Sequence, residues 1–98
     1  MDPVVGFFAG IAIKWLAGLG LEVLKHWTSE NEELLHQFII KITPGEAGDH
    51  YVWESIKKLL PWLIEKAAEN VDKLIVDNDV DALEHIGELL KNIPTDIT

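Results

Sequence analysis

The sequence contains no cysteine and no arginine. Without cysteine it cannot form a disulfide framework, a thiolate zinc site or a cysteine nucleophile. Without arginine it lacks the planar guanidinium group that binds phosphate and carboxylate groups in a bidentate manner. The net charge of −9 adds repulsion from a nucleic-acid backbone, and no basic patch offsets it. We therefore expect no nucleic-acid binding.

The sequence also lacks recognisable motifs for nucleophilic catalysis, phosphate binding and secretion. Ser29 and Ser55 are the only serines, and neither lies in a nucleophile-elbow motif. No glycine-rich phosphate loop is present, because Gly18 and Gly20 lie within an apolar run. The apolar N-terminal run follows Met-Asp-Pro instead of a basic segment, so we expect no signal peptide. These features predict a non-enzymatic protein without a cofactor, and they leave its localisation open.

Charge is distributed unevenly along the 98 residues. Residues 1–27 balance two acids with two lysines, so residues 28–98 carry the whole excess of negative charge. The hydrophobic content of 48% is normal for a folded chain of this length. We therefore expect a single helical domain at 1–98, with an apolar helix in 1–27 and acidic amphipathic helices in 28–98.

Helix signals divide the chain into about four segments. Asp2-Pro3 predicts a helix start and a helix over 3–26. Ser29 and Glu32 fit a capping box, with Ser29 as the N-cap of a helix over 30–42. The segment 43–49 predicts a loop because it is rich in proline and glycine.

The rest of the chain predicts two further helices, over 51–76 and 80–92. Pro61 interrupts the first, at the polar edge of its apolar face, and predicts a kink or a division into two helices. Asp77-Asn78-Asp79 would cap the second. The predicted fold class is all-α: a small bundle of about four helices with an apolar, Gly-rich N-terminal helix and a Pro-kinked third helix. Its core faces are the following: Leu35, Phe38, Ile39 and Ile42; Val52, Ile56, Leu59, Leu60, Leu63, Ala67, Val71 and Leu74; Leu83, Ile86, Leu89, Leu90 and Ile93.

The N-terminal helix carries a heptad stripe that includes a GxxxG pair. We call these residues the seam: Gly6, Gly10, Ile13, Ala17, Gly20, Leu24 and Trp27. Small residues at such positions let two helices approach closely. Since glycine costs about 0.8–1 kcal/mol in a helix relative to alanine, the seam predicts a packing interface.

Bulky apolar side chains occupy the rest of this helix, which therefore needs protein or lipid on nearly all sides. The possible membrane or partner contacts are Phe8, Ile11, Trp15, Leu19 and, on the third helix, Trp62. The stretch from Pro3 to Leu21 approaches the length of a bilayer span, with Lys14 its only charge. Lys14 offsets most of the gain from insertion, so a lone transmembrane helix would be marginal.

Two acidic patterns resemble metal sites only in part. Glu33 and His36 have the E-x-x-H spacing of di-metal bundles, but no second copy is present. The segment 77–88 matches a calcium loop at the following acidic positions: Asp77, Asp79, Asp81 and Glu88. Ala82 stands where that loop needs glycine, so helix capping is the preferred interpretation and no metal is expected.

The sequence favours a self-associating helical protein, a structural component of a larger assembly such as a virion or filament, with the N-terminal helix as its packing seam. Its partners would be further copies or other proteins. One alternative is a small membrane-inserting, holin-like pore former that contacts lipid. Another is a soluble acidic protein that binds or inhibits a basic partner.

Overall fold

The structure is a computed structural model that describes residues 3–43, 45–75 and 79–94, with only the backbone described for 46–50 and 79. Within these residues every regular element is an α-helix. The helices are α1 (Pro3–Leu19), α2 (Leu21–Lys25), α3 (Ser29–Ile42), α4 (Glu46–Glu69), α5 (Val71–Leu74) and α6 (Asp79–Leu90). The four longer helices pack together, which confirms the all-α prediction.

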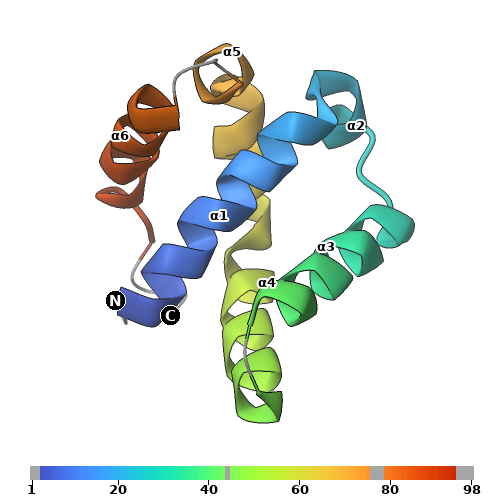
Figure 1. Ribbon diagram of the computed structural model, residues 1–98. Helices are drawn as coiled ribbons and strands as arrows, with labels where there is room; N and C mark the ends of the chain where they lie inside the picture. The colour runs from blue at the N-terminus through green and yellow to red at the C-terminus, as the bar shows by residue number, and fades with distance from the viewer. Residues whose placement is uncertain (1–2, 44, 76–78, 95–98) are drawn as a thin grey trace.

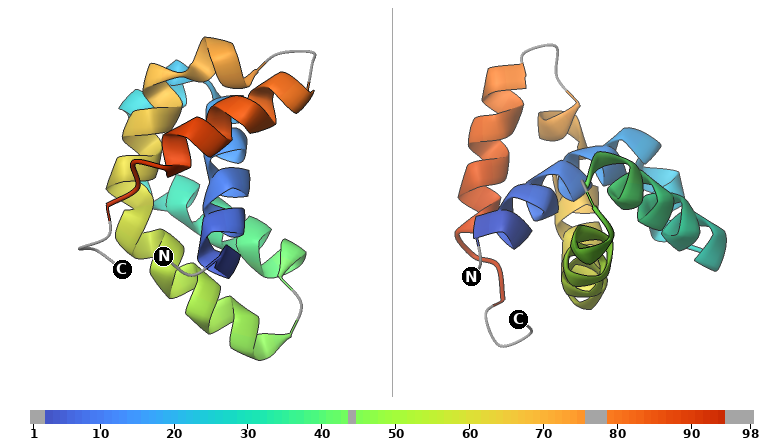
Figure 2. Two further views of the ribbon diagram at one scale, coloured as in Figure 1. Left: turned by 90° about the vertical axis from the view of Figure 1, so that its left-hand side faces the viewer. Right: turned by 60° about the horizontal axis from the view of Figure 1, so that its bottom comes forward.

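Helix α1 is the central element of the fold. It crosses in front of α4, with α6 on one side and α3 on the other (Figure 1), and it contacts each of the other five helices. The views in Figure 2 show the same arrangement from the side and from below. The Cα radius of gyration is 12.6 Å, which matches the value of about 13 Å expected for a compact chain of this length.

The core lies mainly between α1 and α4. The α1 face that meets α4 consists of small and branched side chains, including Ala9, Ala12, Ile13 and Leu16, all with no exposed surface. The predicted α4 face is buried from Val52 to Ala67, and Leu74 of α5 continues it. Pro61 lies inside α4 with its side chain exposed. The missing N–H of Pro61 therefore faces the side of the helix that water reaches, as its position in the sequence predicts.

The N-terminal helix ends earlier than predicted. Gly20 has φ 93° and ψ 159°, which separates α1 from the short α2. This backbone conformation is almost restricted to glycine. The prediction of one helix over 3–26 was therefore wrong, because a glycine counted as part of the helical seam is the residue that breaks the helix.

The cap of α3 lies one residue before the predicted one. Thr28, not Ser29, is the N-cap, and its Oγ1 accepts a hydrogen bond from the Asn31 N–H at 3.3 Å. Ser29 is the first residue of the helix. The capping-box assignment was wrong by one position, because threonine and serine are both good caps and stand side by side here.

The predicted loop over 43–49 is shorter in the structure. Helix α4 begins at Glu46, directly after Gly45, which has φ 81° and ψ 160°. The chain therefore turns at the glycine and enters the helix at once. The other end also differs from the prediction of a helix to residue 76, since α4 ends at Glu69 and α5 follows Asn70.

Helix α6 is rotated relative to the predicted orientation. Ile86 and Ile93 are buried as predicted, but Leu83 is 61% exposed and Ala82 is buried in its place. The predicted cap residues Asp77 and Asn78 lie outside the described residues. The rotation leaves a large apolar side chain of α6 at the surface, next to α1.

Candidate functional site

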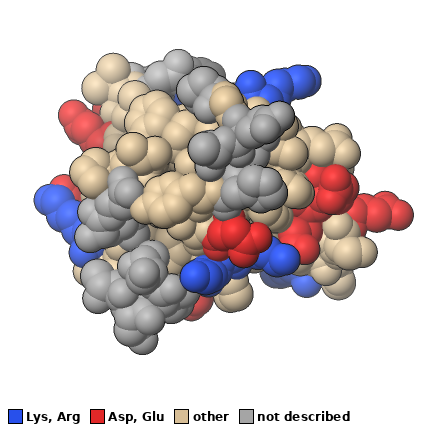
Figure 3. Space-filling view, turned by 90° about the horizontal axis from the view of Figure 1, so that it is seen from below, with Lys and Arg blue, Asp and Glu red and all other residues tan. Residues whose placement is uncertain are grey.

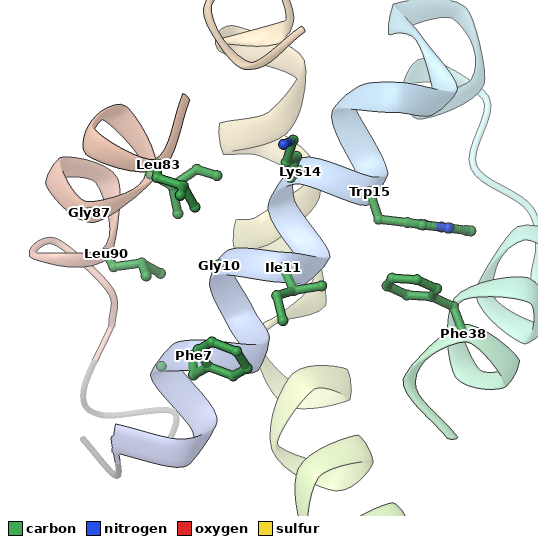
Figure 4. Close-up of a pocket in the computed structure, with 11 residues that line it drawn as sticks. Phe7, Gly10, Ile11, Lys14, Trp15, Phe38, Leu83, Gly87 and Leu90 are labelled. Atoms are coloured by element: carbon green, nitrogen blue, oxygen red, sulfur yellow. The ribbon is translucent and has the colours of Figure 1, made fainter. Parts of the chain in front are cut away.

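An apolar groove runs along the face of α1 that points away from α4. Its volume is about 430 Å³. Helix α1 forms the floor, and α3 and α6 form the two walls (Figure 4). The groove is lined by Gly6, Phe7, Gly10, Ile11, Lys14, Trp15, Phe38, Leu83, Ile86, Gly87 and Leu90.

The floor of the groove is a stripe of bulky side chains spaced four residues apart. Phe7, Ile11 and Trp15 follow one another along α1, and this spacing places them on one side of the helix. Phe7 is 65% exposed, while its ring meets the buried ring of Phe8 edge-on at 5.3 Å. An exposed phenylalanine held against the core is typical of a contact surface.

The α3 wall is built from an aromatic pair. The Trp15 and Phe38 rings stack with centroids 5.6 Å apart and planes 19° from parallel. A second, smaller hollow adjoins this pair, with Leu34, Gln37 and Lys41 on its outer side. Leu34 is 55% exposed, so the apolar surface continues from the groove over α3.

The α6 wall approaches α1 closely because Gly10 has no side chain. A Cβ atom built on Gly10 would lie 3.1 Å from Ile86 Cγ2 and 3.4 Å from Leu90 Cδ1. The distance to Ile86 is shorter than an ordinary contact between carbon atoms. Gly10 therefore sets the distance between α1 and α6, and it leaves Leu83 and Gly87 to form the outer edge of the wall.

Charges lie around the groove and are few inside it. Among the described residues that line it, Lys14 is the one with a charge. The outward side of α6 carries Asp81, Glu84 and Glu88, which we call the acidic border. Gly87 lines both this side and the groove, so the two surfaces meet there.

Charged and uncharged side chains are also separated on the lower end of the molecule. Uncharged side chains cover much of the upper middle of this surface, and acidic and basic side chains gather along its sides and lower part (Figure 3).

Four of the seven predicted seam residues are buried within the chain. Ile13, Ala17 and Leu24 are buried in the core, and Gly10 is covered by α6. Trp27 is partly buried against the core, whereas Gly6 lines the groove and Gly20 lies in the break. Close packing at Gly10 occurs between α1 and α6, which accounts for at least one glycine of the GxxxG pair without a second molecule.

The predicted membrane or partner contacts separate into two groups. Ile11 and Trp15 line the groove. Phe8 is buried, and Leu19 and Trp62 pack against the core. Within the part of the chain that the structure describes, no helix combines the length and apolar character that a membrane crossing requires.

The predicted contact residues did not include several residues of the groove, among them Phe7, Phe38 and Leu83. Phe7 lies four residues before Ile11 and eight before Trp15, and this spacing is the signal that could have identified it. Phe38 and Leu83 were predicted to face the core, because an apolar stripe does not tell which of its members lie at the edge.

Among the described residues, the two candidate calcium ligands Asp81 and Glu88 do not come together. No group of three or more His, Asp or Glu side chains that could hold a metal is found in the described residues. Asp81 and Glu88 are two turns apart on α6, a separation of about 10 Å along its axis. Asp77 and the side chain of Asp79 lie outside what the structure describes.

The E-x-x-H pair joins two helices instead. His36 Nδ1 lies 4.0 Å from Glu33 Oε2. The His36 ring also stacks on Trp53 of α4, with centroids 4.3 Å apart and planes 6° from parallel. His36 therefore packs between α3 and α4.

Comparisons with protein-family models, curated proteins and solved structures find no match to this chain.

Proposed function

We propose that this protein is a non-enzymatic interaction component of a larger assembly, and that its groove binds an amphipathic helix of another protein chain. The single observation that carries the proposal is the apolar groove itself, with Phe7 and Leu83 both more than 60% exposed beside it. An exposed apolar surface bordered by charge is characteristic of a protein-binding site.

The shape of the groove suits a helix. Two helical walls and a helical floor form an open trough, and an amphipathic helix docks into such a trough with its apolar face inward. The α1 residues in the floor run from Gly6 to Trp15, about 14 Å along the helix axis. This length accommodates two to three turns of a bound helix, with anchor residues spaced i, i+3 or i+4, and i+7.

Aromatic residues give the groove suitable anchor points. Phe7, Trp15 and Phe38 provide large, rigid apolar surfaces, and residues of this kind carry much of the binding energy at protein interfaces. The Trp15–Phe38 stack links the floor to one wall. A partner helix would therefore meet a surface whose aromatic pair is already in place, so that less side-chain freedom is lost on binding.

Peptide binding tests this proposal. The probe is a fluorescein-labelled amphipathic helix of about 16 residues, with leucines at i, i+3/i+4 and i+7 spacing and an uncharged polar face. We expect anisotropy to show saturable binding to the wild-type chain. Leu83→Glu should weaken binding at least tenfold, because it places a carboxylate at the groove edge.

Leu21→Glu is the matched control, since Leu21 is an exposed leucine on α2 outside the groove. This control should bind like the wild type. Absence of binding to the wild type, or equal losses in the two variants, would contradict the proposal.

Self-association is the second candidate. Val4 and Phe7 are both exposed at the start of α1, so a second copy would meet this part of the helix and the groove instead of the buried seam residues. Light scattering after size exclusion tests it: an oligomer that Phe7→Glu dissociates would support self-association. A monomer of 11.0 kDa at high concentration would contradict it.

A further inference from the structure

We infer that the helix bound in the groove carries a basic stripe next to its apolar stripe, and that this basic stripe lies against α6. The inference rests on the proposed function and specifies the chemistry and orientation of the partner. It comes from the way in which α6 places its charges relative to the groove.

Two stripes run side by side along α6. Val80, Leu83 and Gly87 are spaced by three and four residues, and the acidic border of Asp81, Glu84 and Glu88 repeats this spacing one residue later. One residue corresponds to a rotation of about 100° around the helix. The acidic border therefore lies next to Leu83 and Gly87, the exposed α6 residues that line the groove.

The acidic border faces solvent and keeps an excess of negative charge. Its three carboxylates are exposed. Lys91 Nζ pairs with Glu88 Oε1 at 3.1 Å, so one ammonium group stands against three carboxylates on this side. Lysines spaced three or four residues apart on a docked helix could pair with these carboxylates, which have the same spacing.

The opposite wall has different chemistry. Leu34, Gln37 and Lys41 of α3 line the hollow next to Trp15, and none of them is acidic. A basic stripe on the partner would be attracted to the carboxylates of α6, whereas the residues of α3 in this hollow offer no such attraction. This difference fixes the rotation of the bound helix around its axis.

A second copy of this chain suits the groove less well. The exposed apolar side chains Val80 and Leu83 belong to the same helix as the acidic border, and the whole chain carries a net charge of −9. Docking α6 of one copy into the groove of another would bring acidic borders together, and like charges at an interface disfavour association.

Three peptides with one apolar stripe test this inference. They carry lysine, glutamine or glutamate at the positions that border the stripe, and their affinities are measured by anisotropy at about 0.02 and 0.3 M salt. We expect the lysine peptide to bind at least tenfold tighter than the glutamine peptide at low salt. Most of this advantage should disappear at high salt, where exposed charges are screened.

Charge reversal on the protein locates the effect. Glu84→Lys should remove most of the lysine peptide's advantage. Glu65→Lys makes the same change in net charge at an exposed position of α4 and should retain it. Equal losses in the two variants would show attraction by net charge alone and would overturn the inference.

The remaining outcomes separate this inference from the proposed function. Equal binding of the lysine and glutamine peptides would overturn the inference and leave the groove as a helix-binding site. Absence of binding by all three would overturn both. A dimer of the protein that the glutamine peptide dissociates would show that the occupant is a second copy, which would also overturn the basic-partner inference.

Discussion

Gly10 determines how closely α6 packs on α1. In Gly10→Leu the new side chain would have to enter the space held by Ile86 and Leu90. Overpacking of this kind costs about 1–3 kcal/mol, so the free energy of unfolding should fall by that amount. Urea denaturation followed by circular dichroism measures it.

Gly18→Leu is the control for this substitution. Nothing lies within 4 Å of a Cβ atom at Gly18, and leucine has a higher helix propensity than glycine. Its stability should be unchanged or slightly raised. A stable Gly10→Leu variant would mean that α6 does not pack on α1 at this position.

Gly20 makes a different contribution, through the backbone. Its φ of 93° with ψ of 159° is strongly unfavourable for residues with a side chain. Gly20→Ala should therefore lower the free energy of unfolding by about 1–3 kcal/mol, although nothing would contact the new Cβ atom. An unchanged urea midpoint would contradict the break between α1 and α2.

Thr28 caps the start of α3. Thr28→Ala removes the oxygen that accepts the Asn31 N–H, and it should cost about 0.5–2 kcal/mol. Ser29→Ala should change stability by a few tenths of a kcal/mol at most, because Ser29 is already inside the helix. The opposite order in thermal or urea unfolding would restore Ser29 as the cap.

A helix could be predicted from the sequence where apolar residues repeat with a period of 3.6 over a long segment. The α4 stripe from Val52 to Ala67 and the outward position of Pro61 are confirmed. Local choices between similar residues were not predictable in the same way. Thr28 and Ser29 are both capping residues, and Leu83 and Ala82 both fit an inward face of α6 until the contact with Gly10 fixes the rotation of that helix.

Helix α1 holds the fold together because it contacts each of the other five helices of the described residues. Leu16 lies on its buried face and has no exposed surface. Leu16→Ala should therefore cost about 2–5 kcal/mol, a large part of the roughly 5–15 kcal/mol that stabilises a domain.

Leu34→Ala is the control for this substitution, since Leu34 is exposed on α3. It should change the free energy of unfolding by about 0.5 kcal/mol or less. Similar losses in the two variants would argue against a core centred on α1.

The groove could be predicted only in part from the sequence. Ile11 and Trp15 were expected to contact a partner or a membrane, and they line the groove. The seam was expected to meet another molecule, but small residues allow close approach whether the neighbouring helix belongs to the same chain or to a second one. The structure places α6 over Gly10 and leaves the Phe7 side of α1 open.

Nuclear magnetic resonance shift mapping tests whether the groove on α1 binds a helix. Unlabelled amphipathic peptide is titrated into ¹⁵N-labelled protein, and the indole signal of Trp15 is assigned with a Trp15→Phe variant. We expect the largest shifts on the Trp15 indole N–H and on the amides of Phe7, Ile11, Phe38 and Leu83. Shifts centred on the outer face of α4 or on α2, or no saturable shifts at all, would contradict helix binding in the groove.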